Sequence, residues 1–107
     1  MEANWHFLGL APLPLPVNFS QVFQIHNDEI WVFRLGTELT AISNVCPHKM
    51  GPLAEGQIIN GRVECPWHGY TFDLITGECT SNKCPKLHRY DVSVDSASQI
   101  LARERKE

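Results

Sequence analysis

The chain has 107 residues, a length that allows one domain with one modest hydrophobic core. Its 43% hydrophobic and 20% charged residues are ordinary globular proportions, and they argue against a disordered chain. A formal net charge of −3 argues against nucleic acid as a partner, because neutralising phosphates requires a basic face.

No run of the sequence approaches the roughly 18 apolar residues that are needed to cross a bilayer. The segment Met1–His6 lacks the basic start and the apolar run of a signal peptide. We therefore expect a soluble, cytoplasmic protein with no membrane partner. In that compartment, four cysteines indicate metal or redox chemistry more than a disulfide framework.

Short segments of alternating or β-branched residues predict strands along most of the chain. Three prolines, Pro12, Pro14 and Pro16, interrupt this pattern early, and we expect an extended surface connector there because proline cannot donate a ladder hydrogen bond. No helical periodicity is longer than two turns, so the predicted class is all-β. The expected strands are residues 5–10, 19–26, 30–35, 38–43, 58–59, 62–64, 70–74, 89–94 and 99–102.

Turn residues separate these strands. We expect hairpin turns at Asn27–Glu29 and at Gly36-Thr37, and a further turn at Thr76-Gly77. Asn60-Gly61 is the dipeptide that best tolerates positive φ, so it predicts a type I′ turn. The charged tail, residues 103–107, is expected to fray.

Two irregular loops contain the same three residue types, cysteine, proline and histidine: Cys46-Pro47-His48 and Cys65-Pro66-Trp67-His68. Sixteen residues separate His48 from Cys65, and the hairpin within them can fold the two loops side by side. Each loop offers one soft thiolate and one imidazole at short spacing. A mononuclear site could use all four, whereas a binuclear cluster would take both cysteines on one iron and both histidines on the other.

The pattern Cys-x-His, sixteen residues, Cys-x-x-His resembles the Rieske [2Fe–2S] signature, as do Gly51-Pro52-Leu53 and Gly69 around it. The resemblance implies one Rieske-type cluster per chain, bound by Cys46, His48, Cys65 and His68. It also implies a single domain over residues 1–107, with an antiparallel β-sandwich or partial barrel as its base. A small cluster-binding subdomain, approximately residues 44–85, would be formed by the two loops.

Some positions depart from the family pattern. High-potential Rieske proteins carry an extra cysteine in each loop, joined as a disulfide, and the matching positions here are Gly51 and Trp67. The hydroxyl-bearing serine and tyrosine of those proteins match Tyr70 and Phe72, and Phe72 has no hydroxyl. Fewer donors to the sulfurs stabilise the reduced cluster less, so we expect a low reduction potential.

The resemblance implies a soluble electron-transfer ferredoxin and not an enzyme, since 107 residues leave no room for the mononuclear iron domain of an oxygenase. Its expected partners are a flavin-dependent reductase and a terminal oxygenase, most typically an aromatic-ring hydroxylating one. Docking is expected near His48 and His68, with the chain a monomer. The alternative is the small Rieske-like subunit of an assimilatory nitrite reductase, whose members often lack the cluster ligands.

Simpler interpretations exist for individual residues. Two cysteines and two histidines can bind zinc, but Cys-x-His is tighter than the usual zinc spacing. Cys–His nucleophilic catalysis would not explain why the pair occurs twice. Cys79 and Cys84 are expected to be small buried residues with free thiols rather than a second metal site or a disulfide. Trp67 could shield the cluster or contact a partner, and the sequence leaves both open.

Overall fold

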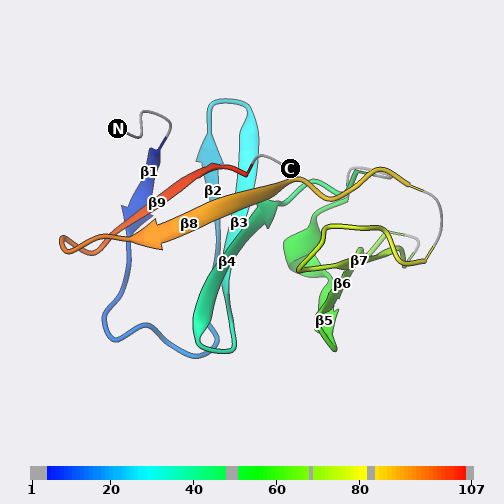
Figure 1. Ribbon diagram of the computed structural model, residues 1–107, viewed down its shortest axis with the longest axis horizontal. Coiled ribbons are helices and arrows are strands. Elements are labelled where there is room, and N and C mark those ends of the chain that lie inside the picture. The colour runs from blue at the N-terminus through cyan, green and yellow to red at the C-terminus, as the bar shows by residue number, and fades with distance from the viewer. Residues whose placement is uncertain (1–4, 48–50, 68, 82–83, 106–107) are drawn as a thin grey trace.

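The protein is all-β, as predicted, and consists of two antiparallel sheets (Figure 1). A computed structural model describes residues 5–47, 51–67, 69–81 and 84–105. The larger sheet has six strands in the order β1-β9-β8-β4-β3-β2, and its two edge strands approach each other so that it nearly closes into a barrel. Its strands are β1 (His6–Leu10), β2 (Ser20–Ile25), β3 (Asp28–Leu35), β4 (Glu38–Ser43), β8 (Arg89–Val94) and β9 (Gln99–Glu104).

The smaller sheet lies to one side of the barrel, between β4 and β8 in the chain (Figure 1). It has three strands, β5 (Gln57–Ile59), β6 (Arg62–Glu64) and β7 (Thr71–Asp73), in that order. A single 3₁₀ turn, Leu53–Glu55, is the only helical element among the described residues. A hydrogen bond from the Ser43 amide to the His88 carbonyl, 2.8 Å long, holds together the two points where the chain leaves and re-enters the barrel.

Strands β3 and β4 are buried on both faces, and this connects the barrel to the smaller sheet. Ile30 and Val32 point into the barrel core, while Trp31 and Phe33 pack on the opposite face against the small subdomain. The alternation follows from the two-residue period of a strand. Because β3 contributes to both cores, the position of the small subdomain is set by packing against the barrel.

Most predicted strands and turns are confirmed. Asn60 and Gly61 have φ of 52° and 78°, as a type I′ turn requires. The first hairpin turn was placed wrongly: Ile25 pairs with Asp28, so His26 and Asn27 form the turn, with His26 at φ 54°. The expected fraying at Arg103 is also wrong, because Arg103 pairs with Asp91 inside β9.

No helix in the described parts of the chain is long and apolar enough to cross a membrane.

Candidate metal centre

Each of the two loops predicted to bind a metal is closed by a backbone hydrogen bond, and the two bonds follow the same pattern. The Cys46 amide donates to the Gly51 carbonyl at 2.9 Å, and the Cys65 amide donates to the Tyr70 carbonyl at 2.7 Å. In both loops the bond runs from the cysteine to the residue five positions later. Each cysteine is therefore fixed at the start of a short loop. Cys65 follows β6 immediately, and Cys46 is the third residue after β4 ends at Ser43.

The two thiols lie together in the apolar core of the subdomain. Cys46 and Cys65 are both free and completely buried, and their side chains are within hydrogen-bonding reach of each other. Burial raises the pKa of the Cys65 thiol, the backbone N–H of Trp67 lowers it by donating to the sulfur, and the neighbouring Cys46 side chain raises it. The site thus places two adjacent sulfurs in a dry environment, with a backbone donor directed at one of them.

The second loop contacts the end of the first at Gly51. A Cβ at Gly51 would lie 2.9 Å from Trp67 Cγ and 3.0 Å from Cys65 Sγ, closer than side chains pack. The Trp67 ring therefore lies over the place where a bridge between the two loops would run, and it remains 50% exposed. Trp67 thus lies beside Cys65 and also reaches the surface, while its contact with a partner stays a prediction.

Gly56 is a second point of close approach. It follows the 3₁₀ turn, and a Cβ there would overlap the backbone carbonyl oxygen of Glu64, the residue before Cys65. It would also come within 3.2 Å of the Pro66 ring. Glycine is required here for space, because only a residue with no side chain lets the two ligand-bearing segments approach this closely.

Asn44 ties the first loop to the barrel, and sequence reasoning did not identify it. It is only 5% exposed, and its side-chain amide donates to Glu29 Oε1 at 3.0 Å while its Oδ1 accepts from the Ala54 amide at 2.7 Å. Its backbone also bonds to the Glu29 carbonyl and the Leu53 amide. An asparagine directly before a predicted ligand loop was the available signal.

Replacing Asn44 should loosen the first loop. We expect Asn44→Ala to lower the free energy of unfolding by about 1–3 kcal/mol, because it leaves the Ala54 amide and the Glu29 carboxylate without their partner. The exposed Asn18 offers a matched control, and Asn18→Ala should change stability by less than about 0.5 kcal/mol. Chemical denaturation of both variants measures the difference; equal effects would contradict the assigned role of Asn44.

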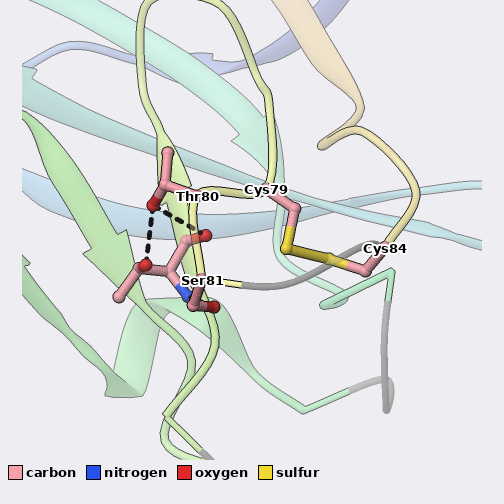
Figure 2. The surroundings of a disulfide bond; sticks show 5 residues. Cys79, Thr80, Ser81 and Cys84 are labelled. Carbon is pink, nitrogen blue, oxygen red and sulfur yellow. Dashed lines mark hydrogen bonds between the residues drawn. A yellow bond between two sulfur atoms is a disulfide. The ribbon is translucent and has the colours of Figure 1, made fainter.

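The prediction that Cys79 and Cys84 are free is wrong. They form a disulfide, with Cα atoms 5.8 Å apart (Figure 2). The physical reason is the turn after β7, which returns the chain so that Cys79 pairs with Phe72 and Cys84 then comes within bridging distance. Both cysteines are partly buried and pack against the core that contains Cys46 and Cys65.

The described donors fit a soft metal centre. Two adjacent buried thiols are the ligand type that iron–sulfur clusters require, and neither is used in the disulfide. The two predicted histidine ligands, His48 and His68, lie outside the described residues, as do Lys49 and Met50. The spacing in the sequence puts one of these histidines in each of the two closed loops.

Comparison with known proteins agrees with this site. Residues 11–94 match the family model of the Rieske [2Fe-2S] domain. The chain is 29% identical over 107 residues to ferredoxin CarAc of Metapseudomonas resinovorans, covering 99% of this chain and 100% of that protein. It resembles the ferredoxin of carbazole 1,9a-dioxygenase from Nocardioides aromaticivorans with a TM-score of 0.75 and 33% identity, over 92% of this chain and 98% of that one.

Another relative is much longer. The chain is 37% identical over 59 residues, 54% of its length, to mouse apoptosis-inducing factor 3, but this covers only 10% of that protein. The relatives from Metapseudomonas resinovorans and Nocardioides aromaticivorans, which match this chain in length, are ferredoxins, that is, electron carriers rather than catalytic oxygenases, as the sequence predicted for this chain. With a matched domain over most of its length and two buried thiols in paired loops, the chain belongs to the Rieske [2Fe–2S] family.

Proposed function

We propose that this chain is a one-electron carrier that receives electrons from a flavin-dependent reductase and delivers them to a terminal oxygenase, one that hydroxylates aromatic rings. The single observation that carries the proposal is the pair of adjacent buried thiols, one of which, Cys65, lies with the half-exposed Trp67 against Gly51. Such a centre is dry but close to the surface. Two relatives of matching length support the same class: one is named a ferredoxin, and the other is the ferredoxin of a carbazole 1,9a-dioxygenase.

We further propose that Cys46 and Cys65 bind one iron and His48 and His68 the other. The cluster, when bound, supplies the one-electron couple of the Rieske type. This chain's contribution is to hold Cys46 and Cys65 at the start of loops with identical backbone closures and to exclude water with Phe72 and Leu53, both fully buried. Trp67 donates its backbone N–H to the Cys65 sulfur.

The proposal places the docking of both partners near His48 and His68. Pro66 and Trp67, which precede His68 in the sequence, are exposed. A small, transient contact is expected there, as for other redox complexes. The proposal also includes a monomeric state and a cytoplasmic location, which size-exclusion chromatography and cell fractionation would test.

A reconstituted electron-transfer assay tests the proposed function. The purified chain, a flavin-dependent reductase and an aromatic-ring oxygenase encoded beside it should together form product, and omission of the chain should stop turnover. Trp67→Ala should slow the transfer to the oxygenase without removing the chain's visible absorption. Copurification with a large sirohaem-containing subunit, with no transfer to an oxygenase, would favour the nitrite reductase alternative instead.

The reduction potential should lie below zero, toward the low end of the range of about −150 to +300 mV for Rieske centres. Phe72 is fully buried in the core that holds both thiols and cannot donate a hydrogen bond to sulfur. Phe72→Tyr adds a hydroxyl and should raise the potential by tens of mV, on the order of other hydrogen-bond effects on such clusters. Protein-film voltammetry measures both; a parent value well above zero would contradict the assignment.

A further inference from the structure

The barrel has a hollow of its own, outside the two ligand loops. It lies at the end of the barrel where β1 begins, β2 turns into β3 and β9 ends (Figure 1, upper side of the barrel). Its volume is about 400 Å³, which is a usual size for a small-molecule site. Polar side chains and residues of the barrel core line it together: His6, His26, Asp28 and Glu104 with Ile25, Ile30, Tyr90 and Ala102.

Tyr90 places a buried side chain at this hollow. The residue is only 7% exposed, and its ring packs edge-on against His88 with the ring centroids 5.1 Å apart. The pKa of Tyr90 is raised to about 12 by its burial and by the charges of Asp28 and Glu104, so its hydroxyl lies close to both carboxylates. Among the described residues no side chain or backbone group hydrogen-bonds this hydroxyl, which is therefore open to a ligand in the hollow.

The hollow carries a negative charge that its own lining does not balance. Asp28 and Glu104 contribute two carboxylates, and the lining, as far as the structure describes it, includes no lysine or arginine. His88 contacts Glu104 with Nε2 and Oε2 3.1 Å apart, and it adds a positive charge only when it is protonated. With neutral imidazoles the formal charge of the lining is −2, so the occupant that balances it carries two positive charges.

The chemistry of the lining favours an organic cation over a metal ion. Within the described parts of the chain, no three or more histidine, cysteine or acidic side chains group closely enough to hold a metal. The His6 and His26 rings instead meet edge to face, with their centroids 6.2 Å apart. Ile25, Ile30 and Ala102 offer apolar surface to a short carbon chain. Carboxylates and neutral imidazoles accept hydrogen bonds from ammonium groups.

We propose that this hollow is a binding site for a short aliphatic diamine in its diammonium form. One ammonium group pairs with Asp28 and the other with Glu104, while the methylene chain lies along the apolar part of the lining. The Tyr90 hydroxyl accepts a hydrogen bond from the ammonium group at Glu104, which is its cross-strand neighbour. The site shares no residue with the metal centre, so the inference stands apart from the proposed function.

Calorimetric titration of the holoprotein with 1,4-diaminobutane, at physiological ionic strength, tests the site. The diamine should saturate one site per chain and bind at least about tenfold more tightly than 1-aminobutane, which offers one charge fewer. Butane-1,4-diol has the same chain length and no charge, and it should give no saturable heat. A diamine that does not bind, or that binds no more tightly than the monoamine, would overturn the proposal.

Two conservative variants locate the binding. Asp28→Asn and Tyr90→Phe keep the shape of each side chain, and each should weaken binding of the diamine about tenfold. Glu38→Gln is the matched control, because Glu38 is an exposed carboxylate on β4 that does not line the hollow, and its loss should change the affinity less than about twofold. Thermal unfolding followed by circular dichroism checks that all three variants fold.

The control decides between a built site and general attraction of cations to a chain with a net charge of −3. If Glu38→Gln weakened binding as much as Asp28→Asn, the attraction would be general and the site would not exist. An unchanged affinity in Asp28→Asn or in Tyr90→Phe would equally contradict the proposed placement of the ligand.

Discussion

Cys65→Ser is expected to abolish the iron–sulfur centre. The serine hydroxyl does not ionise at neutral pH and its oxygen is a harder ligand than the thiolate, so one iron loses a ligand that the buried core cannot replace. Iron and acid-labile sulfide should fall from about two of each per chain to near zero, as a [2Fe–2S] centre requires. The reddish-brown colour and the rhombic EPR signal of the reduced protein should disappear with them.

The disulfide provides the matched control for this experiment. Cys79→Ser/Cys84→Ser removes two sulfurs that pack against the same core, where Cys65→Ser removes one, yet it should leave the colour intact in freshly purified protein. Cys46→Ser, His48→Ala and His68→Ala should behave like Cys65→Ser. A colourless parent chain that holds one zinc ion would contradict the cluster assignment and would support a zinc site formed by two cysteines and two histidines instead.

Among the glycine-to-alanine changes, Gly56→Ala is expected to have the largest effect, because its Cβ would meet backbone more closely than that of any other glycine. The added carbon would overlap the Glu64 carbonyl, which is backbone and cannot rotate away, so the two ligand-bearing segments must separate. We expect a loss of about 1–3 kcal/mol in unfolding free energy, the usual cost of overpacking. Iron content should also decrease, because Glu64 directly precedes Cys65.

Gly36→Ala serves as the control for this variant. Its Cβ would meet no atom within 4 Å, so its only cost is the left-handed backbone at φ 67°, about 1 kcal/mol. Urea denaturation and iron analysis on both proteins give the comparison. If Gly36→Ala lost as much iron as Gly56→Ala, close contact between the loops would not be the reason for a glycine at position 56.

Local patterns predicted most of the strands, because the information needed lies within a few residues. The Glu38–Ser43 and Arg89–Val94 strands have the predicted bounds, and the Asn60-Gly61 turn has the predicted backbone. The first hairpin was misplaced by one residue since His26, not a glycine or asparagine, takes the positive φ there. The register between β2 and β3, in which Ile25 pairs with Asp28, fixes His26 and Asn27 as the turn residues.

The candidate site was predicted in part. Cys46 and Cys65 were identified from paired motifs and are adjacent as expected, while the proposed roles of His48 and His68 stay predictions. Asn44 was missed because its partner Glu29 is fifteen residues away, and residue type alone does not reveal a contact at that separation. The disulfide was missed because disulfides are rare in the cytoplasm, the compartment expected from the sequence. Only the fold shows that the Cα atoms of Cys79 and Cys84 lie 5.8 Å apart, within bridging distance.

The bond between Ser43 and His88 has a consequence for protein engineering. Because the chain leaves and re-enters the barrel at one point, residues 44–87 could be exchanged for a short turn without stretching any barrel strand. Such a miniature barrel would expose Trp31, Phe33 and Ile42, which are now almost completely covered. It would therefore self-associate through that face unless these three positions were made polar. The small subdomain thus also covers an apolar face of the barrel.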